Sequence, residues 1–297
     1  MQYLGLDVGG TTIKAGLIDD TGRILDSRKA PTVIDDLHGF LSTLAELIRD
    51  FQSSSAIDRI GIGVPGLHAR TGIIESSPNI PCLNNVNLEA LVADQVHIPV
   101  VSENDANAGA YGEFKCGAGE GTGHMVYLTL GTGLGSGLIL NGELFTGASG
   151  FGGELGHTII DPGGRLCGCG ARGCLETLVS GTGIVMTAHE RMKTDRPLTA
   201  EIVYEAALHG DAAARAVFEE TGRWLGVACA NMINLLNPEL IVVGGGVMGA
   251  GDMLLKPAIE AARKHAFASS FRDCRIVQSK LWPEAGMVGA GLLARDR

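Results

Sequence analysis

Gly153-Glu154-Leu155-Gly156-His157 opens the most informative stretch of the chain, which closes with Cys167-Gly168-Cys169-Gly170-Ala171-Arg172-Gly173-Cys174-Leu175-Glu176. Three of the seven cysteines fall within eight positions, and one histidine precedes them by ten residues. Thiolate and imidazole are the ligands that tetrahedral zinc prefers, and Cys3His is a common closed structural set. The spacing therefore favours structural zinc at His157, Cys167, Cys169 and Cys174 over three buried free thiols.

Two carboxylates, Glu154 and Glu176, bracket these ligands. Four protein ligands leave zinc no open coordination position, so this metal is not expected to activate water. Because ligand and carboxylate positions alternate along one short segment, we expect the metal to hold the two carboxylates in place for a substrate.

The composition limits the class of protein. A chain of 297 residues with 45% hydrophobic residues is long enough for two lobes with sizeable cores. A net charge of −10 argues against a nucleic-acid binder with a broad basic face. The 44 glycines cluster at strand ends, which indicates backbone that approaches a ligand closely.

The location of the chain is expected to be the cytoplasm, without a membrane partner. Met1-Gln2-Tyr3-Leu4 leads directly into a strand pattern and lacks the basic and apolar regions of a secretory signal. We find no apolar run long enough to span a bilayer. An odd number of cysteines, four of them scattered singly, fits a reduced compartment better than a disulfide framework.

Strands and helices alternate in both halves of the sequence, which predicts an α/β fold. The order strand, Gly/Thr turn, strand at Tyr3–Asp19 returns at His124–Phe145, where Leu138–Phe145 is predicted to be one strand. In between, the glycine-rich segment Gly117–Gly123 is the clearest break in composition. The repeated pattern predicts two related lobes with a boundary near this segment.

The first turn reads Asp7-Val8-Gly9-Gly10-Thr11-Thr12. Consecutive amides of such a turn can hold phosphate oxygens, and Asp7 at the end of a strand can hold Mg²⁺. An ordinary hairpin turn is the alternative. The spacing of a P-loop is absent.

Two further glycine segments are candidates for the same ligand. Gly131-Thr132-Gly133-Leu134-Gly135 repeats the first turn, and a strand follows it where a dinucleotide fold would need a helix. Gly244-Gly245-Gly246 ends an apolar strand, where bare backbone would let an adenine or its ribose lie close. A simple turn from strand to helix is the alternative for this last segment.

Glu103-Asn104-Asp105-Ala106-Asn107 lies where a predicted strand meets a predicted helix. Asp105 is either the N-cap of that helix or a general base that takes the proton of a hydroxyl attacking a γ-phosphate. In the second case Asn104 would orient the hydroxyl.

Together these stretches resemble the ROK family of sugar kinases and repressors, and within it the bacterial glucokinases, over essentially the whole chain. The first turn with Lys14 is similar to the first phosphate motif, Gly131-Thr132-Gly133 to the second, and Glu103–Asn107 to the motif of the catalytic aspartate. The run from Glu154 to Glu176 matches the zinc signature, which is the most specific of these motifs.

The resemblance implies a two-lobed, actin-like, hexokinase-type ATPase fold with a small zinc-binding loop at 157–174. Residues 1–117 would form the first lobe, with the last helix, about 285–297, packed back on it, and residues 118–284 would form the second. ATP with Mg²⁺ would lie across the lobes. The implied nucleotide residues are Asp7, Gly9, Gly10, Thr11, Thr12, Lys14, Gly131, Thr132, Gly133, Gly135, Gly245 and Gly246.

The same resemblance implies a hexose beside Asp105, with Asn104, Glu154, His157 and Glu176 as its partners, and Gly66 and Asn79 nearby. The expected activity is transfer of the γ-phosphate of ATP to the 6-hydroxyl of glucose, with Asp105 as the base. The expected assembly is a homodimer.

Two alternatives to glucose phosphorylation stay open. One is a kinase for N-acetylglucosamine, N-acetylmannosamine, fructose or mannose. The other, from a different class, is a sugar-responsive repressor. We disfavour it because repressors of this family carry an N-terminal helix-turn-helix segment, and here a strand pattern begins at Tyr3.

Overall fold

The structure is a computed structural model and describes residues 1–192, 194 and 196–297. The chain divides into two compact units. Unit 1 comprises Met1–Gly121, Gly137–Gly153 and Lys280–Arg297, and unit 2 comprises Thr122–Ser136 and Glu154–Ser279. Gly137–Gly153 was expected in the second lobe, at 118–284, but it groups with unit 1. Its first residue lies so close to the helix at 105–116 that a Cβ on Gly137 would be 2.6 Å from the Ala110 Cβ.

Unit 1 contains a five-stranded sheet with the order β3-β2-β1-β4-β7. Its first three strands run antiparallel in chain order, and β4 and β7 run parallel to β1. The strands are β1 (Gln2–Val8), β2 (Thr12–Asp19), β3 (Ile24–Pro31), β4 (Arg59–Val64) and β7 (Val100–Asn104).

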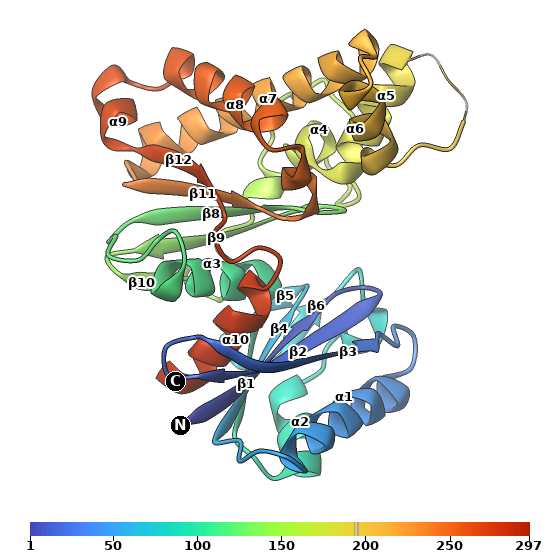
Figure 1. The fold of residues 1–297 in the computed structure, drawn as a ribbon, viewed down its shortest axis with the longest axis vertical. Coiled ribbons are helices and arrows are strands. Elements are labelled where there is room, and N and C mark those ends of the chain that lie inside the picture. Colours follow the sequence, from blue (N-terminus) through green and yellow to red (C-terminus); the bar gives the residue numbers. More distant parts are fainter. Residues whose placement is uncertain (193, 195) are drawn as a thin grey trace. The chain divides into compact units, whose positions relative to one another are not determined.

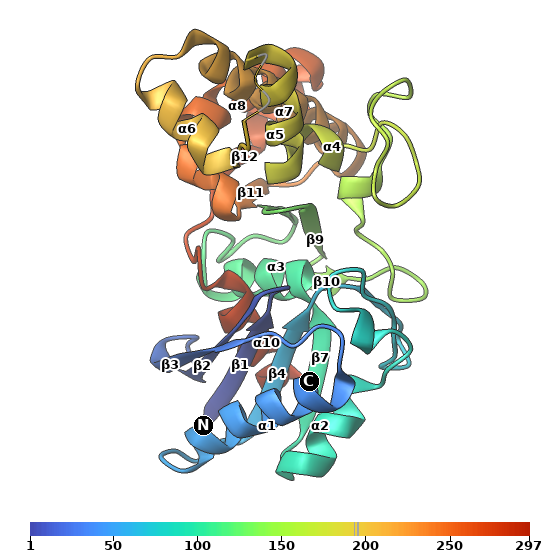
Figure 2. The ribbon, with the colours of Figure 1, turned by 90° about the vertical axis from the view of Figure 1, so that its right-hand side faces the viewer.

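Helices cover both faces of this sheet (Figures 1 and 2). α1 (Leu37–Gln52) and α2 (Leu88–Val96) lie on one face, and α3 (Asp105–Cys116) and α10 (Ala285–Asp296) on the other. Buried apolar residues of α1 recur at helical spacing and pack with β1, β2 and β4 in the core of the unit. They are Phe40, Leu41, Leu44, Ala45, Leu47, Ile48 and Phe51.

α10 rests directly on the backbone of the central strands. A Cβ on Gly5 of β1 would lie 1.9 Å from the Met287 carbonyl oxygen, and one on Gly61 of β4 would lie 1.8 Å from that of Ala290. Glycine is therefore required at both positions for this helix to approach the sheet.

Short elements complete unit 1. β5 (Leu67–His68) pairs with β6 (Ile74–Ser76), and a 3-10 turn, η1, spans Pro81–Leu83. These elements lie between β4 and α2 in the chain, directly after Gly66.

A second five-stranded sheet has the order β10-β9-β8-β11-β12. β8 (Met125–Leu130), β11 (Leu240–Gly244) and β12 (Arg275–Gln278) are parallel, whereas β9 (Leu134–Leu140) and β10 (Glu143–Phe145) form an antiparallel hairpin. The sequence pattern predicted one continuous strand at Leu138–Phe145. The chain instead turns at Asn141-Gly142, where both residues have positive φ (55° and 76°), as a two-residue hairpin turn requires.

The helices of unit 2 lie on both sides of β11 in the chain, and β12 follows the last of them. They are η2 (Leu155–His157), α4 (Glu176–Val179), α5 (Gly181–Met192), α6 (Ala200–Leu208), α7 (Ala212–Leu236), η3 (Gly246–Ala250), α8 (Asp252–His265) and α9 (Ala268–Asp273). Within the described ranges, none of the helices has the length and apolar character needed to cross a bilayer.

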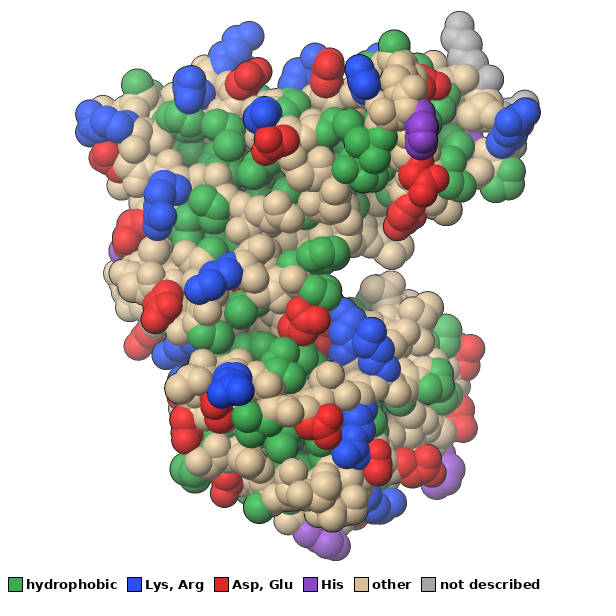
Figure 3. All heavy atoms as spheres, viewed as in Figure 1, with side chains coloured by type: hydrophobic (Ala, Val, Ile, Leu, Met, Phe, Trp, Pro, Cys, Tyr) green, Lys and Arg blue, Asp and Glu red, His purple; other side chains and the backbone are tan. Residues whose placement is uncertain are grey.

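Acidic and basic side chains are interspersed on the face shown in Figure 3. The residues described on that face do not form a broad basic surface.

Candidate active site and metal centre

The candidate catalytic residues lie where β7 passes into α3. Asn104 is the last residue of β7 and the N-cap of α3, because its Oδ1 accepts hydrogen bonds from the backbone N–H groups of Ala106 (2.9 Å) and Asn107 (3.1 Å). The alternative that Asp105 caps the helix is therefore wrong: Asp105 is its first residue. Its Oδ1 accepts from the N–H of Ala106 at 2.9 Å.

Two other predicted sugar residues belong to the same unit. The Asn104 Nδ2 donates to the carbonyl oxygen of Gly66 at 3.1 Å, so these two predicted residues are in contact. Gly66 has a φ of 141°, and a Cβ there would lie 2.5 Å from the Ser76 carbonyl oxygen. Asn79 lies beside the first glycine turn, with its Cβ 3.9 Å from where a Cβ on Gly10 would be.

The first glycine turn joins β1 to β2. The Gly9 N–H donates to the Thr12 carbonyl oxygen at 3.0 Å, which closes the turn around Gly10 and Thr11. Asp7 is the last residue but one of β1. The Lys14 ammonium lies 3.9 Å from its carboxylate and donates to the Pro283 carbonyl oxygen at 3.1 Å.

Asp7 is a partly enclosed carboxylate with 24% of its side chain exposed. Burial raises the pKa of Asp7, and the charge of Lys14 partly offsets that rise. The start of α10 encloses it further, because a Cβ on Gly286 would lie 2.9 Å from the Asp7 Cγ. An incompletely solvated carboxylate of this kind suits a divalent cation, which would compensate its charge.

The four predicted metal ligands come together in unit 2. One ligand atom from each of His157, Cys167, Cys169 and Cys174 lies within 4.8 Å of those of the others. The Cys169 and Cys174 sulfurs are 3.6 Å apart, and the Cys167 sulfur is 3.7 Å from His157 Nδ1.

These distances suit a tetrahedral zinc ion. Bonds of about 2.3 Å to sulfur and about 2.0–2.1 Å to nitrogen give tetrahedron edges of about 3.5–3.8 Å. Burial raises the pKa of the Cys174 thiol to about 12, whereas the backbone N–H of Ala171 lowers that of Cys169. A bound divalent cation would convert such thiols to thiolates, so the donor set fits zinc both in geometry and in chemistry.

Glu176 connects the metal group to the second glycine turn. Its Oε2 accepts a hydrogen bond from the Leu134 N–H at 2.9 Å, and its Oε1 lies 3.6 Å from the Cys167 sulfur. A Cβ on Gly133 would lie 2.4 Å from Glu176 Oε2, so the turn has no room for a side chain there. Glu154 precedes η2 and is exposed, and its carbonyl oxygen accepts from the His157 N–H at 3.2 Å.

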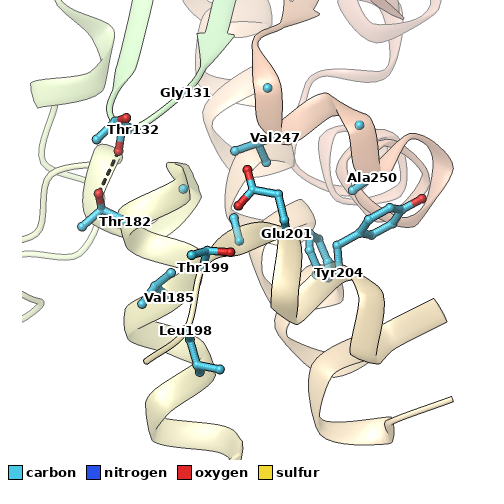
Figure 4. A pocket seen from close by; sticks show the side chains of 15 residues that line it. Gly131, Thr132, Thr182, Val185, Leu198, Thr199, Glu201, Tyr204, Val247 and Ala250 are labelled. Atoms are coloured by element: carbon cyan, nitrogen blue, oxygen red, sulfur yellow. Dashed lines mark hydrogen bonds between the residues drawn. The ribbon is translucent and has the colours of Figure 1, made fainter. Parts of the chain in front are cut away.

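A cavity of 510 Å³ in unit 2 adjoins this turn (Figure 4). The Thr182 hydroxyl donates to the Thr132 carbonyl oxygen at 2.9 Å, and the Gly181 N–H donates to that of Gly131 at 2.8 Å, so the turn and the start of α5 are joined. Figure 4 shows the Glu201 carboxylate directed toward Val247. The volume is in the range of small-molecule sites, which are about 300–1,000 Å³.

Three of the predicted nucleotide residues line this cavity: Gly131, Thr132 and Gly246. Three others are not among its lining residues. Gly133 faces Glu176, and Gly135 lies within β9. Gly245 has a φ of 88°, and Leu130 leaves no space for a Cβ there. The sequence reasoning missed the wall that α5, α6 and α7 supply. Its lining residues are Gly181, Thr182, Val185, Leu198, Thr199, Ala200, Glu201, Tyr204 and Phe218.

The predicted sugar residues are distributed over both units. Gly66, Asn79, Asn104 and Asp105 belong to unit 1, and Glu154, His157 and Glu176 belong to unit 2.

Comparison with known proteins agrees with these motifs. The profile of the ROK family matches residues 3–297. The chain belongs to the ROK family. A glucokinase of Thermotoga maritima is 35% identical over all of this chain and 98% of its own length, and one of Halalkalibacterium halodurans is 38% identical over 99% and 95%.

A solved structure extends the ROK likeness to the fold. The ROK family glucokinase from Streptomyces griseus, in complex with glucose and AMPPNP, matches with a TM-score of 0.89 and 34% identity over all of both chains. The chain therefore has the α/β, hexokinase-type fold of ROK glucokinases.

Proposed function

We propose that the chain is an ATP-dependent glucokinase that transfers the γ-phosphate of ATP to the 6-hydroxyl of glucose. The observation that carries the proposal is the full-length likeness to a ROK glucokinase whose structure holds glucose and a non-hydrolysable ATP analogue. The position of Asp105 beside Asn104 at the end of β7 supports it, because a base for a hydroxyl must be held rigidly.

In the proposed reaction the oxygen of the glucose 6-hydroxyl attacks the γ-phosphorus of ATP. The bond from this phosphorus to the oxygen that bridges the β- and γ-phosphates breaks, and ADP leaves. The hydroxyl proton passes to the Asp105 carboxylate. Positioning and charge neutralisation supply most of the catalysis in such transfers.

Asn104 and Glu176 are proposed to orient the sugar together with Glu154, His157, Gly66 and Asn79. The Nδ2 and Oδ1 atoms of Asn104 are tied to Gly66 and to the start of α3, so its amide is fixed. An amide has two N–H donors, and the one not aimed at Gly66 would donate to a sugar hydroxyl.

The nucleotide is proposed to use both glycine turns and the cavity of unit 2. Gly9, Gly10, Thr11 and Thr12 would receive phosphate oxygens through their amides, with Lys14 nearby, and Gly131 and Thr132 would do so from the second turn. The cavity would take the nucleoside, because apolar side chains such as Val247 and Phe218 line it together with a few polar groups.

Two metals are proposed. Asp7 would hold Mg²⁺, which when bound neutralises phosphate charge. His157, Cys167, Cys169 and Cys174 would hold a structural zinc, which when bound fixes the loop that carries Glu176.

A coupled ADP-release assay tests the function directly. With ATP as donor, we expect the highest kcat/KM for glucose in a panel with mannose, fructose, N-acetylglucosamine and N-acetylmannosamine. A higher kcat/KM for an N-acetylhexosamine would overturn glucose as the substrate and leave the kinase class intact. ADP release that no sugar stimulates would overturn the kinase itself.

A further inference from the structure

Arg165 lies in the loop that carries the metal ligands, two residues before Cys167. Its guanidinium has five N–H donors, and the structure gives five hydrogen bonds from it. Nε and Nη2 bind the two carboxylate oxygens of Glu190 at 3.2 and 2.8 Å. Only 19% of the side chain is exposed.

The three remaining bonds reach two different helices. Nη1 donates to the carbonyl oxygen of Thr177 in α4 at 2.8 Å and to that of Gly183 in α5 at 3.3 Å. Nη2 donates to the Thr187 hydroxyl in α5 at 3.0 Å. Thr177 directly follows Glu176, so one guanidinium joins the loop to the residue beside the proposed sugar ligand.

The backbone of Arg165 also closes the loop. Its carbonyl oxygen accepts from the Gly173 N–H at 2.9 Å, which joins the segment just before Cys167 to the residue just before Cys174. A Cβ on Gly173 would lie 1.6 Å from the Asp161 carbonyl oxygen, so the two halves are in tight contact.

The same helices hold the second glycine turn. α5 begins at Gly181, whose N–H binds the Gly131 carbonyl oxygen, and Glu176 at the start of α4 binds the Leu134 N–H. Arg165 therefore connects the metal loop to both ends of the segment that contains Gly131–Leu134.

We propose that Arg165 is a positioning residue that sets Glu176 and the second glycine turn relative to the metal group. This inference rests on the proposed function, in which Glu176 holds the sugar. Lysine cannot replace it, because an ammonium has three donors and lacks the planar fork that reaches Glu190, Thr177 and Thr187 together.

The test compares Arg165→Lys with Arg191→Lys as a matched control. Arg191 is also on the α5 side of unit 2 and pairs with a glutamate, Glu220, but it contacts neither the loop nor α4 in the interactions found for the described residues. Glu190→Gln is a milder second variant. It removes the charge that pairs with Arg165 but leaves the bonds from the guanidinium to the carbonyl oxygens of Thr177 and Gly183.

Two readouts are measured on the zinc-loaded protein: zinc release to a chromogenic chelator, and KM for glucose against kcat. We expect Arg165→Lys to release zinc faster, because the loop loses its bonds to α4 and α5. The glucose KM should rise by about 10–100-fold, the range by which loss of the contacts around a metal site lowers metal affinity or activity. kcat at saturating glucose should stay within about threefold. Arg191→Lys should match the wild type in every readout, and Glu190→Gln should be intermediate.

The inference is overturned if zinc release or the glucose KM of Arg165→Lys equals that of the wild type. If Arg165→Lys does not fold, Glu190→Gln decides by the same criteria. Failure of the proposed function can be distinguished from failure of this inference. A wild type that phosphorylates no sugar would still release zinc at a measurable rate, and the zinc-release rates of the variants would still test the role of Arg165.

Discussion

The carboxylate of Glu176 accepts a hydrogen bond from the backbone N–H of Leu134 at 2.9 Å, and its other oxygen lies 3.6 Å from the sulfur of Cys167. One side chain thus touches both the metal group and the end of the second glycine turn. A zinc ion held by the four proposed ligands would have no open coordination position, so it would fix neighbours such as Glu176 rather than react.

Zinc removal should therefore loosen the sugar site. We expect about one zinc per purified chain by metal analysis, and its loss in Cys169→Ala together with a lower melting temperature. Structural zinc contributes about 10–16 kcal/mol in peptides, comparable to the roughly 5–15 kcal/mol of a whole domain. Cys82→Ala is the control, since this half-buried cysteine lies outside the group. A zinc-free, fully active wild type would exclude the metal site.

Asp105→Asn tests the proposed base. Asparagine keeps the oxygen that accepts from the Ala106 N–H, so the start of α3 should be preserved. We expect kcat to fall by about 10²–10⁴-fold while the glucose Kd, measured by calorimetry, stays within a few-fold of wild type. Near-wild-type turnover would reduce Asp105 to a structural residue of the helix start.

Asp7 should introduce a dependence on pH and Mg²⁺. Its pKa is raised mainly by burial, and only the ionised carboxylate binds Mg²⁺ well. At limiting Mg²⁺, kcat/KM for ATP should therefore fall with decreasing pH at a higher pH than for an ordinary aspartate. Saturating Mg²⁺ should move that fall to lower pH, because the cation favours the ionised form. A profile independent of Mg²⁺ would contradict the role of Asp7.

The same raised pKa has an effect of opposite sign on stability. A carboxyl that is more easily protonated in the folded chain contributes fully to stability below its unfolded pKa, about 3.9, and this contribution is lost as pH rises through the folded pKa. Asp7→Asn should therefore be more stable than wild type at pH 7, and this advantage should shrink near pH 3. Denaturant melts at the two pH values measure it.

A substitution at Gly249 would fill the cavity that is proposed to take the nucleoside. Gly249 lines the cavity, and nothing lies within 4 Å of where its Cβ would be. We expect KM for ATP to rise along the series Ala, Leu, Phe at this position, by about tenfold or more for Phe, with little change in KM for glucose. Equal effects on both substrates would argue against a nucleoside in this cavity.

Gly61→Ala tests the contact between α10 and the sheet. The new Cβ would meet the Ala290 carbonyl oxygen at 1.8 Å, and overpacking of a core typically costs about 1–3 kcal/mol. We expect a lower free energy of unfolding in denaturant melts. Gly249→Ala, which adds the same methyl group in open space, should be close to neutral. Equal stability of the two variants would show that α10 can shift away from the sheet at little cost in free energy.

Local signals in the sequence predicted several of the residue groupings that the structure contains. The Cys/His spacing placed four ligand atoms within 4.8 Å of one another, and the repeated Gly/Thr turns each follow the first strand of a sheet. The sequence also contains a signal that the prediction of one continuous strand missed. Asn141-Gly142 is typical of a two-residue hairpin turn, and both residues have positive φ.

Contacts between distant segments were not predictable in this way. The capping of α3 by Asn104 depended on which of two adjacent polar residues leaves the helical conformation. The wall of the cavity from α5 to α7 and the bonds of Arg165 to Thr177 and Glu190 arise from tertiary packing. A single sequence carries no periodic pattern for such contacts.

The placement of α10 also has a consequence for synthesis of the protein. This helix supplies one face of the sheet that contains β1, yet the sequence of unit 2 lies between them. A ribosome adds about 5–20 residues per second, so α10 is synthesised on the order of 15–60 s after β1. During translation the first sheet is therefore uncovered on one face at Gly5 and Gly61, and we expect chaperones to meet the nascent chain there.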